Sequence, residues 1–294
     1  MQSQNSLNLS NGIFFKLKSS FKKLYKNSNF YEKRISKTFD NNFEYKPSPH
    51  LLSSIIKYQK KKYKIEDFAT ETIWKNNIST KDFKKLNNFF WFFSLDLKSS
   101  KETTQSIILN WINKNEKFDE NIWEFNITAK RIIAWLSNHQ LTYEDSNEEY
   151  RLFFNHMLQK QTNHLLNEIK NLDETEEKLI GCAAIILTGL AYKDEKNYLD
   201  SGLNILKNLI KHSLDKQGFP KSRNIQNLVF YLKYLIIIRE WFKESQNPIP
   251  EYVDETIYYL GSSYAFIWQN IKQDIFFNGN YSSNHHEFDQ YLKR

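Results

Sequence analysis

The residues best suited to ligand chemistry lie in one short stretch, Gly218-Phe-Pro-Lys-Ser-Arg-Asn224. Arg223 offers a guanidinium fork and Asn224 an amide donor, and the two together suit a carboxylate ligand. A structural interpretation competes with this one. In it, Arg223 pairs with a nearby acid and Asn224 caps a helix that starts at Ile225. The sequence leaves both interpretations open.

Histidines provide two further arrangements. His285-His286-Glu287 has the composition of a metal pair, but adjacent side chains on a helix diverge and no third ligand is suitably spaced. A solvated tail without metal is therefore predicted. His156 and His164 lie eight residues apart on one expected helix and can line one face as ligands, or lie on the surface or in the core.

Basic residues outnumber acidic ones, 41 to 34, which gives a net charge of +7. This charge favours a polyanionic partner, although a Lys-, Asn- and Ile-rich composition is also what AT-rich codons produce. The segment Lys57–Lys64 mixes lysines with tyrosines, but a solvated helix face explains it better than nucleic acid binding. No glycine-rich phosphate loop, nucleophile elbow or zinc motif occurs, so no cofactor is predicted.

The N-terminal sequence, the lengths of the apolar stretches and the cysteine content predict the cellular compartment. Met1–Ser20 has no continuous apolar region and no cleavage site, so we expect a soluble, cytoplasmic protein. The longest apolar stretches are far shorter than the ~20 residues that cross a bilayer. Cys182, the single cysteine, cannot form an intrachain disulfide and is expected in the core.

Apolar residues recur with a helical period of three and four along most of the chain, whereas Gly and Pro number only seven and five. Each of three strongly apolar helices is followed by a second amphipathic one, and the equivalent residues Ala129, Ala183 and Leu232 are 54 and 49 positions apart. The pattern predicts an all-α fold of helical hairpins, arranged as a solenoid or a toroid. The expected pairs are Phe125–Leu136 with Tyr150–Ile169, Leu179–Leu190 with Tyr198–Leu214, and Leu228–Ile238 with Tyr252–Ile271.

Helix boundaries are marked by capping residues. Ser79-Thr-Lys-Asp82 predicts a capping box that opens a helix through Leu97, and another helix is expected over Glu102–Ile112. Asp173 is expected to cap the helix that follows it, and Pro250 to begin another. Residues 1–72 are less regular and form an irregular helical N-terminal segment.

Several segments, taken in order, resemble the bacterial branch of heparinase II/III-like polysaccharide lyases. The stretch Phe89-Phe-Trp-Phe-Phe-Ser-Leu-Asp-Leu97 is similar to the Trp-rich helix of that family, and Gly218–Asn224 is similar to its Ser-Arg-Asn loop. Phe277-Asn-Gly279 matches the turn that closes the family's helical half. Shorter matches are Ile73-Trp74, Asn110-Trp-Ile112 and Arg131-Ile-Ile-Ala-Trp-Leu136.

The resemblance implies an incomplete (α/α) toroid over residues 73–279, with 280–294 leading to a β-sandwich half that the sequence does not contain. It implies eliminative cleavage of uronic-acid polysaccharides, in which Arg223 and Lys221 bind substrate and Asn224 and Tyr281 act in catalysis. The loop departs from the family pattern at Gln217 and Pro220, and no histidine follows closely after Asn224, where the sequence reads Ile225-Gln-Asn-Leu228.

Three hypotheses follow from these observations. The chain is the helical half of a lyase that cleaves or binds an acidic polysaccharide, an inactive toroid that only binds glycan, or a helical scaffold for a protein partner. The resemblance favours the first, and family members of this kind are often periplasmic or associated with the cell envelope. Neither a nucleic acid nor a membrane-spanning segment is expected.

Overall fold

The structure, a computed structural model, describes residues 20–39, 44–56, 64–65, 79–192, 196–269, 275–277, 280–282 and 288–292. Helices account for nearly all of the regular structure in these ranges, and residues 20–26 form an additional helix that precedes α2. The elements are α2 (Asn29–Ile35), α3 (Pro49–Ile56), α4 (Thr80–Asn87), η3 (Phe90–Ser94), α5 (Lys101–Asn115), α6 (Phe125–Ser137), α7 (His139–Thr142), α8 (Glu148–Glu168), η4 (Ile169–Asn171), α9 (Thr175–Ala191), α10 (Lys196–Ser213), α11 (Ile225–Glu244), α12 (Glu251–Gln269), β1 (Ile275–Phe277), β2 (Asn280–Ser282) and α13 (Asp289–Leu292).

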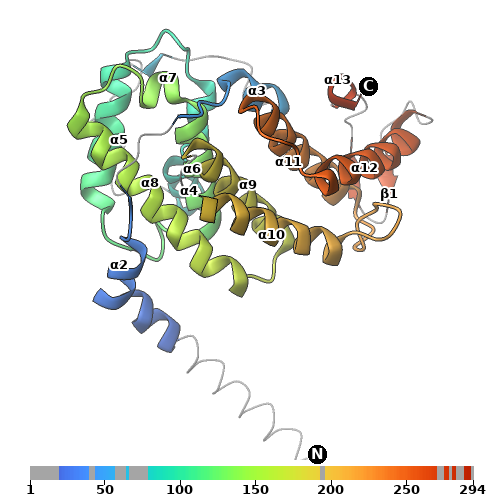
Figure 1. Cartoon of the computed structure of the whole chain (residues 1–294), viewed down its shortest axis with the longest axis horizontal. Helices are drawn as coiled ribbons and strands as arrows, with labels where there is room; N and C mark the ends of the chain where they lie inside the picture. The colour runs from blue at the N-terminus through green and yellow to red at the C-terminus, as the bar shows by residue number, and fades with distance from the viewer. Residues whose placement is uncertain are drawn as a thin grey trace, which may run out of the picture.

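Three helical hairpins form the body of the protein, as the periodicity predicted. Helix α6 packs with α8, α9 with α10, and α11 with α12, and α9 also contacts α6 and α11. In Figure 1 these pairs follow one another across the molecule. The all-α class is confirmed, with one short antiparallel ribbon, β1 with β2, as an addition. Closure into a toroid stays a prediction.

Helix α9 occupies the centre because its sequence is apolar on every side. Residues 179–191 are buried without interruption, including Cys182 as expected. A helix that is apolar all round can be stable only when neighbours cover its whole circumference. Burial raises the pKa of the Cys182 thiol well above its usual value, which suits a packing role.

A buried cation, Arg131, joins α6 to the segments around it. Its guanidinium donates to Gln161 Oε1 at 2.7 Å and to the carbonyls of Asn87 and Ile122 at 2.8 and 3.2 Å, and it lies 4.1 Å from the Trp111 ring. No carboxylate pairs with it among the described residues. Hydrogen bonds and the aromatic face therefore replace water around this charge.

The polar residues of α8 hold the N-terminal segment rather than a ligand. The Tyr31 hydroxyl lies 2.7 Å from His164 Nδ1, and Thr38 Oγ1 lies 2.8 Å from His156 Nδ1. Gln159 bonds both backbone groups of Phe39, at 2.9 and 3.1 Å. Both histidines thus have structural partners.

Two boundary predictions are wrong. Ser79 caps α4 as expected, accepting from the Asp82 amide at 3.2 Å, but the helix ends at Asn87 and does not reach Leu97. Phe89 then adopts a left-handed backbone with φ of 57°, and η3 follows. A straight helix would point consecutive rings in all directions, whereas this turn lets both Phe89 and Phe92 be fully buried.

Asp173 does not cap α9. The residue before the helix is Glu174, which makes no side-chain cap bond. Acidic residues in the first turn, Glu176 and Glu177, supply the favourable charge at this helix end instead. Pro250, by contrast, immediately precedes α12 as expected, and its carbonyl accepts from the Val253 amide at 2.8 Å.

Some sequence features lie outside the described residues. These are Ile73-Trp74, Asn278-Gly279, His285–Glu287 and all of the basic segment Lys57–Lys64 except its last residue. Within the described residues, no helix combines the length and apolarity that crossing a membrane requires.

Candidate functional site

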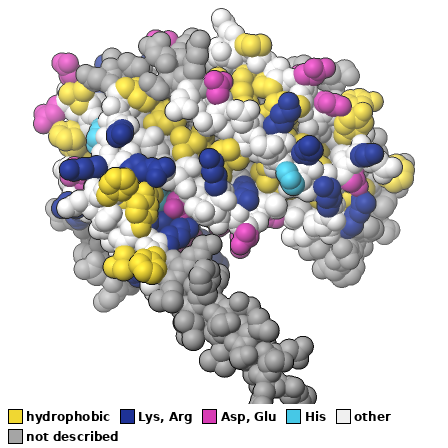
Figure 2. Space-filling view, turned by 60° about the horizontal axis from the view of Figure 1, so that its bottom comes forward, with side chains coloured by type: hydrophobic (Ala, Val, Ile, Leu, Met, Phe, Trp, Pro, Cys, Tyr) yellow, Lys and Arg dark blue, Asp and Glu magenta, His cyan; other side chains and the backbone are white. Residues whose placement is uncertain are grey.

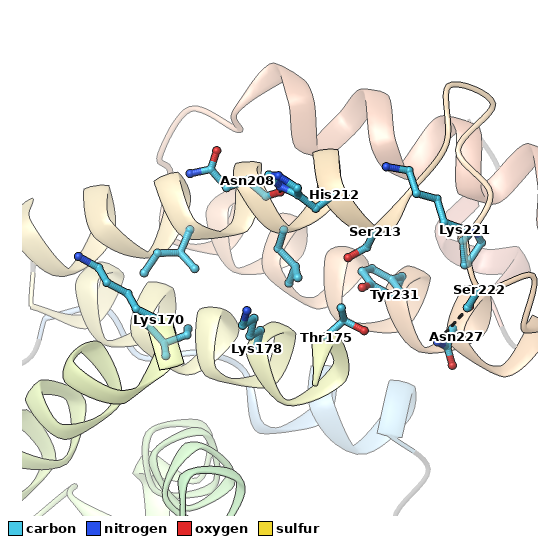
Figure 3. Close-up of a pocket in the computed structure, with 14 residues that line it drawn as sticks. Lys170, Thr175, Lys178, Asn208, His212, Ser213, Lys221, Ser222, Asn227 and Tyr231 are labelled. Atoms are coloured by element: carbon cyan, nitrogen blue, oxygen red, sulfur yellow. Dashed lines mark hydrogen bonds between the residues drawn. The ribbon is translucent and has the colours of Figure 1, made fainter. Parts of the chain in front are cut away.

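A cavity of about 530 Å³ opens where three helix ends meet (Figure 3). Its walls are the N-terminal ends of α9 and α11, the C-terminal end of α10 and the loop residues Pro220–Ser222. The volume falls within the range of roughly 300–1,000 Å³ that is typical of ligand pockets. The cavity is therefore large enough for a small ligand or one part of a chain.

Cationic side chains surround this cavity. Lys170, Lys178 and Lys221 line it together with His212, and none of the described Asp or Glu residues lines it. The amino ends of α9 and α11 add partial positive charge from their backbone amides. Glu176 lies near enough to raise the pKa of Tyr231, so its carboxylate partly offsets the positive potential. The balance favours an anionic ligand.

Hydroxyl groups form the inner wall of the cavity. Figure 3 shows the side chains of Thr175, Ser213 and Tyr231 close to one another. Burial raises the pKa of Tyr231, and interactions with the Ser213 and Thr175 hydroxyls partly offset that effect. In the described part of the chain, neither Tyr231 Oη nor Ser213 Oγ has a hydrogen-bond partner of normal geometry. Both oxygen atoms are buried behind the cavity surface, so a ligand reaches them only if neighbouring side chains move.

His212 is the candidate proton acceptor at the cavity rim. Its Nδ1 lies 2.7 Å from the Asn208 carbonyl oxygen one helical turn earlier, and that oxygen can only accept. Nδ1 therefore carries the proton, and Nε2 is the nitrogen able to accept one. The exposed position of His212 lets a ligand reach this atom.

The loop between α10 and α11 is organised by Asp215. Its Oδ1 accepts from the amides of Gln217 and Phe219, both at 2.9 Å, and Leu214 forms an isolated bridge with Pro220. Gly218 has a φ of +72°, a backbone conformation that L side chains rarely adopt. The turn places Pro220–Ser222 against the cavity.

Arg223 and Asn224 both have structural partners. Arg223 Nη1 lies 2.8 Å from Asp215 Oδ2, and its guanidinium lies 5.5 Å from the Phe219 ring. Partial burial opposes ionisation of Asp215, but the backbone donors and Arg223 lower its pKa. Asn224 caps α11 by accepting from the Gln226 amide at 2.8 Å. Neither residue lines the cavity.

Of the four predicted site residues, Lys221 lines the cavity, where its Nζ also lies 3.2 Å from the Lys211 carbonyl oxygen. Tyr281 lies on β2, where its backbone pairs with Phe276, and the structure does not describe its side chain. The structure thus brings Lys221 together with residues that the sequence did not single out. These are Lys170, Lys178, His212 and Tyr231, which come from η4, α9, α10 and α11.

The missed residues carried little sequence signal. Asn208 and His212 are one helical turn apart at the end of α10, so polar residues in the last turn of that helix were the one visible hint. Three comparisons with known proteins, by family models, curated sequences and solved structures, found no match.

Proposed function

We propose that the cavity between α9, α10 and α11 binds an acidic polysaccharide that contains uronic acid, in a chain that serves as the helical half of a heparinase II/III-like protein. The observation that supports this most is the convergence of three lysines and a histidine, from four separate elements, around a hydroxyl-lined cavity. Carboxylates of the polymer would contact the ammonium groups, and sugar hydroxyls would contact the exposed Ser222 and the half-buried Asn227, which also line the cavity.

Eliminative cleavage needs two things from such a site: cations that neutralise the uronate carboxylate, and a base beside the α proton. Lys178 and Lys221 are suited to the first role, and His212 Nε2 to the second. Tyr231 is a poor base because it is only 1% exposed and burial raises its pKa. We therefore propose that this chain binds the polysaccharide and shows little or no eliminative cleavage.

Binding should be measured with heparan sulfate and alginate at several salt concentrations, with absorbance of the unsaturated uronate as the assay for cleavage. The Lys178→Gln/Lys221→Gln variant should bind roughly tenfold more weakly, since each lost ion pair at a partly exposed site contributes under about 1 kcal/mol. Lys81→Gln/Lys114→Gln changes the net charge equally at exposed positions away from the cavity and should bind like the wild type.

Equal weakening in both double variants would show that diffuse charge, not the cavity, attracts the glycan. Absence of binding at low salt would support the protein-scaffold hypothesis instead. The role of Asn224 is tested separately, because Asn224→Ser keeps a good capping residue while removing the amide. If Asn224 is only a cap, this variant keeps wild-type stability and wild-type glycan affinity.

A further inference from the structure

The N-terminal segment of residues 20–39 is fixed firmly to the body of the protein. Asn163 Nδ2 donates to the carbonyls of Ile35 and Lys37, both at 2.9 Å. Tyr31 and Ile35, one turn apart on α2, are buried. The opposite side of the segment is therefore a defined outer surface.

Large apolar side chains lie on that outer surface. Phe21, Leu24 and Phe30 are 69%, 68% and 68% exposed. On α2, Phe30 shares its outward face with Lys33 and Arg34, three and four residues later, which are also exposed. Clusters of exposed apolar side chains mark interaction surfaces on soluble proteins. We call these three residues together with Lys33, Arg34 and Lys37 the N-terminal face.

The charge around the N-terminal face is strongly positive. Lys22 and Lys26 pair with Glu168, Lys23 pairs with Glu120, and Lys160 pairs with Glu32. Lys33, Arg34 and Lys37 form no ion pair with any other described residue. Seven cations thus face three carboxylates. Figure 2 shows hydrophobic and basic side chains side by side in the lower left of the view, the part of the molecule where α2 lies in Figure 1.

A second aromatic surface on the molecule has the opposite charge. On α12, Tyr258 and Phe266 are 69% and 76% exposed, and the exposed acidic residues Glu251, Asp254 and Glu255 share that helix. Exposed aromatic residues are therefore common to both ends of the chain, while the excess of basic residues is specific to the N-terminal face. This contrast indicates a partner that is both apolar and anionic.

A cavity of about 320 Å³ adjoins the basic side of the N-terminal face. Arg34 and Lys37 line it with the amide side chains of Asn167 and Asn197, and Phe39 and Leu166 add apolar surface. Guanidinium, ammonium and amide groups are the usual donors to phosphate oxygens. The cavity therefore has the chemistry to hold a phosphate group next to exposed apolar residues.

We propose that the N-terminal face docks on the surface of a bilayer that contains anionic phospholipids. Phe21, Leu24 and Phe30 enter the boundary between headgroups and acyl chains, and Lys33, Arg34 and Lys37 contact headgroup phosphates, with one phosphate at the cavity. Basic residues beside Phe and Leu are the composition of segments that lie in the membrane interface. The sequence just before the face, residues 13–18, reads Ile-Phe-Phe-Lys-Leu-Lys and continues the same composition.

The test is cosedimentation of the full chain with vesicles of phosphatidylcholine alone or mixed equally with phosphatidylglycerol. The wild type should bind the mixed vesicles at least tenfold more tightly than the neutral ones, and added salt should weaken this binding. Each cation removed in Lys33→Gln/Arg34→Gln should cost about fivefold in affinity. Phe21→Ser/Leu24→Ser/Phe30→Ser should abolish most of the remaining binding.

The matched control is Tyr258→Ser/Phe266→Ser, which removes equally exposed aromatic residues from acidic surroundings and should leave vesicle binding unchanged. Lys178→Gln/Lys221→Gln should also bind vesicles like the wild type, so the vesicle-binding test and the glycan-binding test have independent outcomes. Equal affinity for neutral vesicles, or full binding by the apolar triple variant, would overturn the proposal. Displacement by millimolar inorganic phosphate would identify a free-phosphate site instead, and a changed oligomeric state of the triple variant with unchanged vesicle binding would identify a contact between copies.

Discussion

His164 should make the stability of this protein depend on pH. The side chain is 1% exposed on α8, and its Nε2 lies 2.8 Å from the Trp123 carbonyl oxygen, which can only accept. Nε2 therefore carries the proton, and Nδ1 accepts from the Tyr31 hydroxyl at 2.7 Å. Both nitrogens are satisfied in the neutral ring. A second proton, on Nδ1, would reverse the direction of the hydrogen bond with Tyr31 and place a charge in the core.

Burial lowers the pKa of His164 from 6.5 to about 3, with Lys26 and Arg131 acting in the same direction and Glu168 and the Trp123 carbonyl opposing them. The imidazole is thus protonated below about pH 6.5 in the unfolded chain, but only below about pH 3 in the folded chain. Stability is fully present above the unfolded pKa and falls as the pH drops through this window. Between about pH 7 and about pH 5 the loss from this one group is about 2 kcal/mol.

Urea unfolding followed by far-UV circular dichroism at these two pH values measures the effect. His164→Gln should unfold more easily at both values, but its stability should depend less on pH than that of the wild type, by about 2 kcal/mol. His139 and His156, whose pKa values are also lowered by burial, contribute equally to both proteins and cancel in the comparison.

Trp123→Phe is the control, because it weakens the same part of the core and leaves the histidine in place. This variant should keep the pH dependence of the wild type. If the wild type and His164→Gln lose the same stability between the two pH values, the imidazole does not stay neutral in the folded protein, and the argument from its two hydrogen bonds fails.

Two further substitutions test structural roles. Arg131→Met should lower the free energy of unfolding by about 3–5 kcal/mol, because Gln161 Oε1 and two backbone carbonyls lose their donor. The control Arg151→Met, at a half-buried position, should cost under about 1 kcal/mol. If Arg131→Met keeps wild-type stability in urea unfolding, those hydrogen bonds only offset the cost of burying the charge. Gly218→Ala should destabilise by about 1–3 kcal/mol and weaken glycan binding, since φ is +72° and the new Cβ would lie 2.3 Å from Tyr259 Cβ. The control is Gly261→Ala, whose new Cβ would contact only the flexible end of the Leu292 side chain and should destabilise the protein less. Equal melting temperatures for the two alanine variants would show that the left-handed backbone of Gly218 is not what makes its substitution costly.

The sequence by itself determined the fold class and most helices. The apolar period predicted α6, α8, α9, α10 and α12 to within four residues at each end, because a helical stripe is a local property of the chain. It also predicted α11, which continues six residues beyond the expected end at Ile238. The Ser79 cap and the start of α12 after Pro250 were equally local and were predicted correctly. Among the predicted site residues whose side chains the structure describes, Lys221 is the one that lines the cavity.

Tertiary packing decided the cases in which the local pattern was ambiguous. Phe89–Phe93 is apolar at every position and fits a continued helix as well as a turn. The structure adopts the turn, because Phe89 then packs edge-on against Trp111 and Trp135, whose rings lie 6.0 and 5.3 Å from it. Those two partners are 22 and 46 residues away along the chain, a distance that no helical period encodes.

The cavity and the role of α8 also depended on tertiary structure. Lys178, His212 and Tyr231 converge because of how α9, α10 and α11 are rotated and stacked, and the sequence specifies that only through the whole core. The same holds for His164, which the sequence offered equally as a ligand or as a core residue. Its partner Tyr31 is 133 residues away, and only the folding of the N-terminal segment onto α8 brings the hydroxyl to the imidazole.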